Sequence, residues 1–320
     1  MEILDLRHFR SADLRPLMEE ESVVWSRDLD WDYGPSAEMI LRYLDARILP
    51  GYAAVEEGSL AGYAFFVYEG SKGIIGDLFV REPAAQAAAN GTPSLGERLL
   101  SHVIETLQNS PGIHRIEAQL LPHPAGALAR PFTQGGFQRH PRLFMHLALS
   151  AARDWASPGQ PKAAEIELRP WSDADFNAAA AVITAAYRDH VDADINDQYR
   201  TLSGSLRFLN NIVRFPGCGV FDPGSSRVAI HKPSKSAVGL ILCSRVKEAV
   251  GHVTQVCVVP EHRGAGTGEA LVAASAANLE SRGFQTLSLT VTEANTRAVE
   301  LYRRLKFEQA KVFDAFVWEG

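Results

Sequence analysis

The stretch Val258–Leu271, VVPEHRGAGTGEAL, places an arginine and three glycines at the expected turn between a strand and a helix. The apolar run His252–Val259 predicts a buried strand, and Pro260 ends it because proline has no N–H for the ladder. The first amides of the following helix lack partners and carry partial positive charge, and glycines let a ligand approach them. With the guanidinium of Arg263, this loop predicts a phosphate-binding site. A glycine-rich turn without a ligand is the alternative interpretation.

A second pair of residues lies downstream, in LTVTEANTRAVELYRRLKFE. Asn295 and Tyr302 are seven residues apart, nearly two helical turns, so one helix face is expected to carry both side chains. A plain N-cap is the alternative role for Asn295, and a core position with its hydroxyl at the edge is the alternative for Tyr302.

Two common phosphate motifs do not fit the loop. The dinucleotide fingerprint G-x-G-x-x-G fails because Glu269 stands at the third glycine position, and the Gly-Lys-Ser/Thr of a P-loop is absent. The pattern R-x-x-G-x-G does fit, with Arg263, Gly266 and Gly268 behind V-x-P. Together with Asn295, Tyr302 and the strand start Lys306–Phe307, this pattern resembles the GCN5-related N-acetyltransferase (GNAT) superfamily. The residues that carry the resemblance are Val258, Pro260, Arg263, Gly266, Gly268, Asn295, Tyr302, Lys306 and Phe307.

This resemblance covers residues 164–320 well and the first half of the chain in outline. It implies that the cosubstrate is acetyl-CoA, with its pyrophosphate on the glycine loop. It further implies direct transfer of the acetyl group, in a ternary complex, to a primary amine of an unidentified acceptor. The residues that it assigns to acetyl-CoA are Val256, Cys257, Val258, Arg263, Gly264, Ala265, Gly266, Thr267, Gly268, Glu269, Asn295 and Tyr302.

The catalytic residues that the resemblance implies are Tyr302 and His252. Tyr302 would protonate the CoA thiolate or simply hydrogen-bond its sulfur. Backbone N–H groups of Val256–Val258 would polarise the thioester carbonyl. Histone-acetylating relatives have a glutamate eleven residues before the loop arginine, and here that position is His252, whose side-chain type suits a base at neutral pH. A strand-end histidine meeting solvent is the alternative. Gln255 is no base, but its amide is suited to orienting a water or the substrate.

The acceptor is expected near YRDHVDADINDQYR (Tyr187–Arg200), where relatives place their first helices. Four aspartates there could steer a cationic amine, and a solvated acidic helix start is the alternative. They are Asp189, Asp192, Asp194 and Asp197.

Residues 151–163, with two prolines and a glycine, predict a linker between a domain of residues 1–150 and a domain of residues 164–320. The halves look duplicated: DLRHFRSADL matches ELRPWSDADF, and GERLLSHVIETL matches GEALVAASAANL. The expected fold class is α/β (α+β), with two tandem GNAT-like domains, each a mixed, mostly antiparallel twisted sheet flanked by helices.

The first copy lacks the chemistry of the second. Its aligned residues are Gly91 for Arg263, Ser94 for Gly266, Ala125 for Asn295 and Phe132 for Tyr302. We therefore expect a degenerate first domain, structural or substrate-shaping, and one catalytic domain.

Composition bounds the remaining properties. The 320 residues carry a formal net charge of −6, which argues against nucleic acid or an anionic membrane as a partner. The sequence favours a cytoplasmic protein for three reasons. It has three cysteines without a CxxC pair, no signal-like start, and no apolar stretch long enough to span a membrane. The histidines do not have the spacing of metal ligands, so no metal cofactor is expected. The sequence does not indicate an oligomeric state. Two alternative functions stay open: a non-catalytic acyl-CoA-binding or regulatory module, and an enzyme with a mycothiol-synthase-like cysteinyl amine as acceptor.

Overall fold

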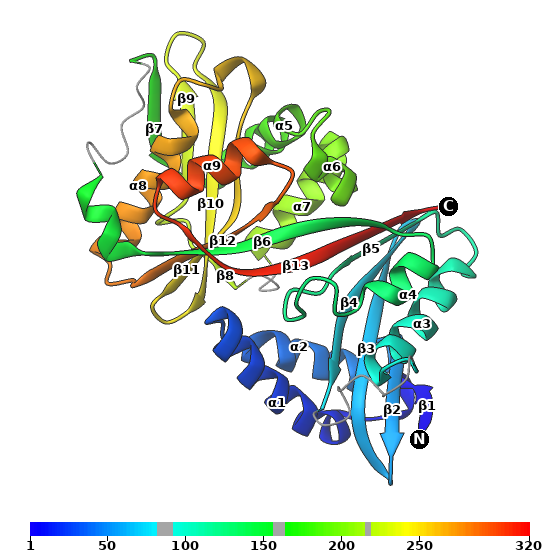
Figure 1. Ribbon diagram of the computed structural model, residues 1–320. Helices are drawn as coiled ribbons and strands as arrows, with labels where there is room; N and C mark the ends of the chain where they lie inside the picture. The colour runs from blue at the N-terminus through cyan, green and yellow to red at the C-terminus, as the bar shows by residue number, and fades with distance from the viewer. Residues whose placement is uncertain (82–91, 156–163, 215–218) are drawn as a thin grey trace. The chain divides into compact units, whose positions relative to one another are not determined.

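The computed structural model describes residues 1–81, 92–155, 164–214 and 219–320 (Figure 1). The chain forms two compact units. Unit 1 contains Met1–Arg142 and Val312–Gly320, and unit 2 contains Leu143–Lys311. These limits differ from the expected segments 1–150 and 164–320, since each unit takes a strand from the other half of the chain. Residues 156–163 of the expected linker lie outside the described residues.

Unit 1 is a mixed sheet with helices on both faces. Its strand order is β1-β2-β3-β4-β5-β13, and every neighbouring pair is antiparallel except β4 and β5. The elements are β1 (Glu2–Asp5), α1 (Ser11–Leu29), α2 (Gly34–Asp45), β2 (Gly51–Glu56), β3 (Ser59–Glu69), β4 (Lys72–Val80), α3 (Leu95–Gln108), β5 (Arg115–Gln119), α4 (Ala129–Gln134) and the end of β13 (Glu308–Glu319).

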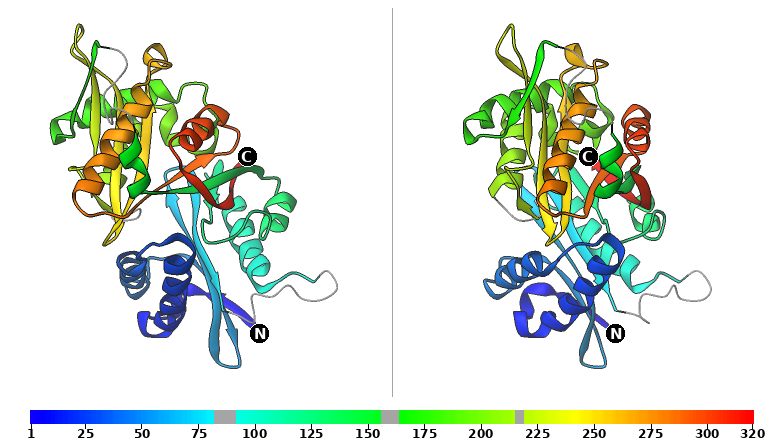
Figure 2. Two further views of the ribbon diagram at one scale, coloured as in Figure 1. Left: turned by 60° about the vertical axis from the view of Figure 1, so that its left-hand side comes forward. Right: turned by 90° about the vertical axis from the view of Figure 1, so that its left-hand side faces the viewer.

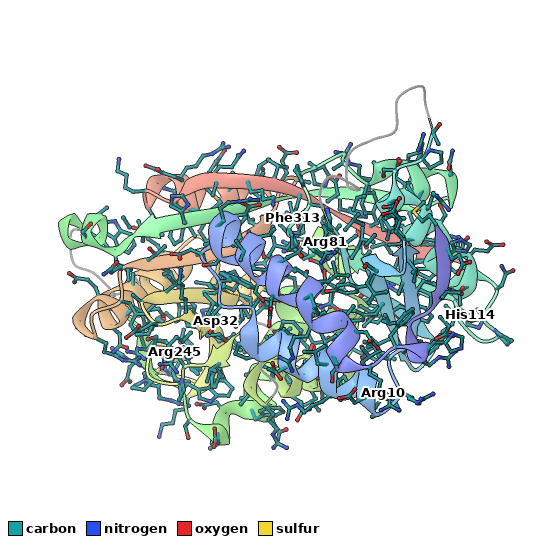
Figure 3. The ribbon with its side chains drawn as sticks, turned by 90° about the horizontal axis from the view of Figure 1, so that it is seen from below. Arg10, Asp32, Arg81, His114, Arg245 and Phe313 are labelled. Carbon is teal, nitrogen blue, oxygen red and sulfur yellow. The ribbon has the colours of Figure 1, made fainter. Side chains whose placement is uncertain are left out.

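Alternation along the strands of unit 1 separates two cores. Tyr63 and Phe65 of β3 pack with α1 and α2, while Ala64 and Phe66 pack with α3. Because successive strand residues point to opposite faces, the two helix layers lie on opposite sides of the sheet. Phe313 of β13 is 2% exposed, so this last strand also packs inward (Figure 3).

Unit 2 repeats the arrangement. Its strand order is β6-β12-β11-β10-β9-β7, with β8 paired to β10. The elements are β6 (Gln138–Ala148), β7 (Ile166–Pro170), α5 (Phe176–Ala186), α6 (Val191–Ile195), α7 (Leu202–Arg214), β8 (Val220–Phe221), β9 (Arg227–His231), β10 (Ser236–Lys247), β11 (Val250–Val258), α8 (Thr267–Ser281), β12 (Thr286–Thr292), α9 (Thr296–Arg304) and the start of β13.

Helices also cover both faces of the sheet in unit 2 (Figures 1 and 2). Leu240 and Leu242 of β10 pack with α5 and α7. The opposite face of β10, to which Gly239 belongs, contacts α8, since a Cβ on Gly239 would lie 3.4 Å from Leu271. The expected α/β fold of two similar domains is confirmed. Within the described segments, no helix is both long and apolar enough to cross a membrane.

The repeat extends to irregular features. The parallel pairing of β4 with β5 ends at Ile75, and that of β11 with β12 ends at Val253, each after four residue pairs. Both strands then bulge by one residue against their antiparallel neighbour. Beyond the bulge, Asp77 of β4 and Gln255 of β11 occupy the same register position. A shared bulge at a shared place indicates a duplicated domain, since bulges are designed local features.

The final strand of each half is exchanged. In unit 1, Ala315–Glu319 of β13 pair with Gln119–Arg115 of β5, although β13 ends the second half of the chain. In unit 2, β6 from the first half lies beside β12.

Candidate active site in unit 2

Two neighbouring strands of unit 2 separate at one end. The parallel register of β11 and β12 stops at Val253 and Leu289, but β11 continues to Val258 and β12 to Thr292. The N–H of Val259 donates to Val238 on the β10 side, at 2.9 Å. Because strand residues alternate, the N–H and C=O groups of Val256 and Val258 face the opposite, open side. The expected oxyanion donors therefore lie where β11 has no strand partner.

The glycine loop forms the turn from β11 into α8. Gly264 and Gly266 have φ values of 82° and 79°, in the left-handed region that favours glycine. Gly266 is the N-cap of α8 and has no side chain with which to cap it. The first intrahelical bond there joins Ala270 N–H to Gly266 O, at 2.9 Å. The amides of Thr267, Gly268 and Glu269 thus have no intrahelical acceptor and are free for a ligand.

Gly268 is a glycine that the protein fold does not require. Its φ is not positive, and an added Cβ would meet only Leu301 and Val258, both at 3.9 Å. Alanine would also suit a helix start better than glycine. A ligand that approaches the helix amides closely explains the absence of a side chain. Next to it, the hydroxyl of Thr267 is buried and has no hydrogen-bond partner within the described residues.

Arg263 is held by the protein itself. Its Nε donates to Val258 O at 2.9 Å, and its Nη2 donates to Ala186 O at 2.5 Å. The guanidinium therefore ties the loop to the ends of β11 and α5. A second arginine, Arg297 in the first turn of α9, lies beside the loop: a Cβ on Gly264 would be 3.7 Å from its Nη2. Sequence reasoning missed Arg297, although it stands two residues after Asn295.

The two residues of the α9 motif have different surroundings. Asn295 is the N-cap, and its Oδ1 accepts from Ala298 N–H at 3.3 Å, so it does not project from the helix face that carries Tyr302. Tyr302 is 6% exposed. Burial raises the pKa of its phenol above the usual value, and the nearby Asp192 and Cys257 add to this rise in pKa. Tyr302 therefore keeps its proton at neutral pH, and its hydroxyl can donate a hydrogen bond.

The thiol of Cys257 is not a nucleophile here. Burial raises its pKa to about 12, so the unreactive thiol form is present at neutral pH. Cys257 belongs to the apolar core with α5 and α7. Its expected place in the cosubstrate site rests on its backbone.

His252 lies on the paired part of β11, opposite Ser288 of β12. It is buried, its ring stacks on Phe144 with centroids 6.3 Å apart, and its Nδ1 lies 2.9 Å from Ser288 Oγ. Ser288 Oγ also donates to Gly251 O at 3.3 Å, which leaves its lone pair to accept Nδ1–H of His252. This contact orients the ring of His252.

A chain of contacts crosses the open end between β11 and β12. On the β11 side, the Tyr187 hydroxyl lies 3.3 Å from Gln255 Oε1 and 3.5 Å from Val256 O. The Tyr187 ring meets His190 edge-on at 5.2 Å, and His190 Nδ1 accepts the N–H of Asp192 at 3.1 Å. On the β12 side, the hydroxyl of Thr292 donates to Asp192 Oδ1. The segment from Tyr187 to Asp192 thus bridges the two strand ends.

The same places in unit 1 are closed by protein groups. Ser94 and Glu97 form a capping box at the start of α3: Glu97 N–H donates to Ser94 Oγ at 3.2 Å, and Ser94 N–H donates to Glu97 Oε2 at 2.8 Å. Phe132 of α4 is fully buried and stacks on Phe316 at 4.0 Å. Gly91, the expected match of Arg263, lies outside the described residues.

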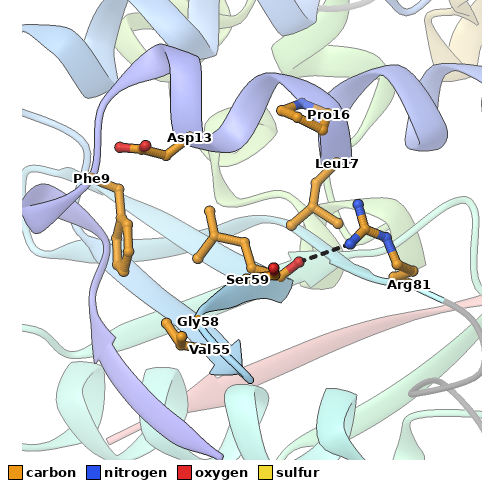
Figure 4. A pocket seen from close by; sticks show the side chains of 9 residues that line it. Phe9, Asp13, Pro16, Leu17, Val55, Gly58, Ser59 and Arg81 are labelled. Atoms are coloured by element: carbon orange, nitrogen blue, oxygen red, sulfur yellow. Dashed lines mark hydrogen bonds between the residues drawn. The ribbon is translucent and has the colours of Figure 1, made fainter.

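Unit 1 also has a pocket of about 370 Å³ between α1 and the β2–β3 turn (Figure 4). The Arg81 guanidinium at its rim is occupied, because it binds the Glu20 carboxylate at 2.6 Å and Leu60 O at 3.2 Å. Its lining therefore offers no free cation for phosphate. Among the residues that the structure describes, no group of three His, Cys, Asp or Glu side chains could hold a metal ion.

Part of unit 2 is similar to a known family of proteins. Residues 194–307 match the acetyltransferase (GNAT) family. A mycothiol acetyltransferase of Saccharomonospora viridis is 28% identical over 89% of this chain and 95% of its own length. A mycothiol acetyltransferase of Thermobispora bispora is 52% identical over 58 residues, which are 18% of this chain and 20% of that protein.

Solved structures show the same fold over the whole chain. A GCN5-related N-acetyltransferase from Sphaerobacter thermophilus has a TM-score of 0.67 at 20% identity, covering 99% of this chain and 95% of that one. A tandem GNAT protein from the clavulanic acid biosynthesis pathway has a TM-score of 0.56 at 15% identity, covering 99% and 98%.

Proposed function

We propose that this chain is a GNAT acetyltransferase with two domains of that fold, and that unit 2 transfers the acetyl group of acetyl-CoA to a primary amine. The observation that carries the proposal is the start of α8. It combines uncapped amides, a glycine at position 268 that the fold does not need, and a buried Thr267 hydroxyl without a partner in the described chain. An anion at a helix start gains roughly 0.3–1 kcal/mol from the helix dipole, in addition to its hydrogen bonds.

The residues proposed for acetyl-CoA divide by chemistry. The backbone of the Gly264–Glu269 loop would hold the diphosphate, with Ala265 between the two left-handed glycines. Arg263 would keep this loop in shape through its two carbonyl contacts, and Arg297 would supply the positive charge beside Gly264. Asn295 would act indirectly, by fixing the start of α9 on which Arg297 and Tyr302 lie.

The thioester would lie at the open end of β11. There, N–H groups of Val256 and Val258 face away from β10 and are suited to the carbonyl oxygen of the acetyl group. Tyr302 would give its proton to the departing sulfur, a role that its buried, protonated phenol supports.

An amine must lose a proton before it attacks. With a lysine-like pKa of about 10.4, its deprotonation at pH 7 costs roughly 4.6 kcal/mol. We propose His252 as the base, since its imidazole is buried on β11 and its ring is oriented by Ser288, whose Oγ lies 2.9 Å from Nδ1. His252 lies in the paired part of β11, so a water is expected to connect it with the amine.

The relatives favour one acceptor to test first. The curated relatives reported above are named mycothiol acetyltransferases, and one of them aligns along nearly its whole length. A mycothiol-type cysteinyl amine is therefore the second, more specific candidate acceptor for this chain.

The test measures binding and turnover separately. Isothermal titration is expected to show one acetyl-CoA per chain, with affinity about tenfold lower in Arg297→Ala and unchanged in Arg304→Ala, at the other end of α9. Free thiol release is then followed with a panel of amines that includes a cysteinyl amine. Binding without thiol release for any amine would favour the non-catalytic module, and absence of binding would refute the proposed function.

A further inference from the structure

The four aspartates near the acceptor region are not equivalent in the structure. Asp192 has a side chain that is 15% exposed, whereas that of Asp194 is 65% exposed and lies 3.7 Å from Arg200. Asp189 lies in the turn before α6 and Asp197 in a short 3-10 helix after it. Asp192 is bound to the end of β12, through Thr292.

The contacts of Asp192 fix its carboxylate without neutralising it. Thr292 donates a neutral hydroxyl to Oδ1. His190 Nδ1 lies 3.5 Å from Oδ2, but this nitrogen accepts the N–H of Asp192 and therefore carries no proton in that arrangement. The negative charge of Asp192 is thus positioned by hydrogen bonds and has no cationic partner in these contacts.

A second, independent observation indicates that a ligand binds between the strand ends. Gln255 is 6% exposed, its Oε1 lies within hydrogen-bond distance of the Tyr187 hydroxyl, and its Nε2 has no partner in the described parts of the chain. An unpaired buried amide is unfavourable, and a bound polar ligand would supply the missing hydrogen-bond partner. Gln255 and Asp192 are the two ends of the contact chain that runs through Tyr187 and His190.

We propose that Asp192 binds the ammonium group of the acceptor, at the open end between β11 and β12, and so selects acceptors that arrive as cations. This inference rests on the proposed function, because the acetyl thioester is expected at the same opening. Thr292 and His190 act as positioning residues for the carboxylate. The nearness of Asp192 to Tyr302, which contributes to the raised pKa of that phenol, agrees with this placement.

The test uses two CoA thioethers and needs no knowledge of the natural acceptor. S-(2-aminoethyl)-CoA carries an ammonium group close to the point of transfer, and S-propyl-CoA is a neutral analogue of similar size. Titration calorimetry at low salt is expected to show that wild-type protein binds the ammonium compound about tenfold more tightly than the neutral one.

Two variants locate this preference. Asp192→Asn keeps an oxygen that Thr292 can donate to, so its fold should persist, and its preference should fall to about onefold. Asp194→Asn makes the same change of charge on the same helix and should keep the tenfold preference.

The outcomes separate this inference from the proposed function. Equal affinities of wild type for the two thioethers, or an unchanged preference in Asp192→Asn, would overturn the role of Asp192. Failure of wild type to bind either thioether or CoA itself would instead refute the proposed cosubstrate site.

Discussion

Units 1 and 2 share their fold, including a bulge at the same place in β4 and β11. The residue after the bulge, Asp77 or Gln255, has different hydrogen bonds in the two units. In unit 1, Asp77 is satisfied on both oxygens: Tyr33 donates to one, and Leu78 N–H donates to the other at 2.8 Å. In unit 2, the Tyr187 hydroxyl meets Gln255 in the same way, but the amide nitrogen is left without a partner in the described segments. Both residues thus meet a tyrosine hydroxyl, and the two units differ in the partner of the other polar atom.

The first turns of α3 and α8 also differ in whether a protein group binds their amides. The Glu97 carboxylate occupies the start of α3 and is itself bound by Arg130 at 2.6 Å, whereas α8 begins with Gly266 and uncapped amides. On the following helix, the fully apolar Phe132 takes the place of Tyr302. The comparison teaches that internal contacts occupy the start of α3 and the place of Tyr302 in unit 1, while the start of α8 in unit 2 has no side-chain cap.

The largest expected effect concerns the hydroxyl that unit 1 lacks. Tyr302→Phe removes the proposed acid, so kcat should fall by about 100-fold, while the affinity for acetyl-CoA should change less than twofold. Steady-state kinetics and titration calorimetry measure the two quantities. A kcat within twofold of wild type would eliminate the acid role of Tyr302.

A smaller effect is expected from the glycine at the second position of α8. Gly268→Ala should stabilise the helix by roughly 0.5–1 kcal/mol, because the fold leaves room for a Cβ. The added methyl should nevertheless weaken acetyl-CoA binding by about tenfold, since it lies where the diphosphate approaches the amides.

Unit 1 provides the matched control for this variant. Gly96 is the second residue of α3, and a Cβ there would meet Leu128 and Leu78 at 3.4 Å, which is ordinary contact. Gly96→Ala should leave acetyl-CoA affinity unchanged. Equal losses of affinity in both variants would contradict the assignment of a single cosubstrate site to unit 2.

The smallest effect concerns the buried acid of unit 1. Glu21 is 1% exposed, accepts from Trp25 Nε1 at 3.1 Å and from the hydroxyl of Tyr63, and lies beside Asp77. Burial and the Asp77 carboxylate raise the pKa of Glu21 well above its usual 4.5. The folded chain therefore holds a proton that the unfolded chain has lost.

This proton makes the stability of unit 1 pH-dependent. Its contribution is complete below the unfolded pKa of Glu21 and is lost as the pH rises through the higher pKa of the folded state. Scanning calorimetry from pH 5 to pH 8 should show a fall in Tm that is about 2–4 °C smaller in Glu21→Gln than in wild type. The neighbouring Glu20→Gln, an exposed residue, should behave as wild type does, and parallel curves for all three proteins would show that Glu21 does not carry this effect.

Much of the fold could be predicted from local pattern. The strand expected at His252–Val259 agrees with β11, Val250–Val258, because Pro260 marks its end. The helix expected after the glycine loop is α8, Thr267–Ser281. The exchange of β6 and β13 could not be predicted, since an alternating strand pattern specifies a buried face and not a partner strand.

The candidate site could be predicted only where its residues are close in sequence. Loop and helix motifs identified Gly266, Gly268 and Tyr302. The partner of the Arg263 side chain, Ala186 O, is 77 residues away, and nothing near Arg263 indicates it. Asp192 could not be distinguished from its acidic neighbours, because the hydrogen bond to Thr292 spans 100 residues.

The pairing of β13 with β5 also determines the order in which the two units can finish folding during synthesis. Unit 1 needs Ala315–Glu319 beside β5, and Gly320 N–H reaches His114 O at 3.0 Å. A ribosome makes most of unit 1 first, yet makes the last strand of unit 1 only after the whole of unit 2. Unit 1 is therefore begun first and finished last, and a nascent chain halted before residue 312 would expose the bare edge of β5 to other unpaired strands.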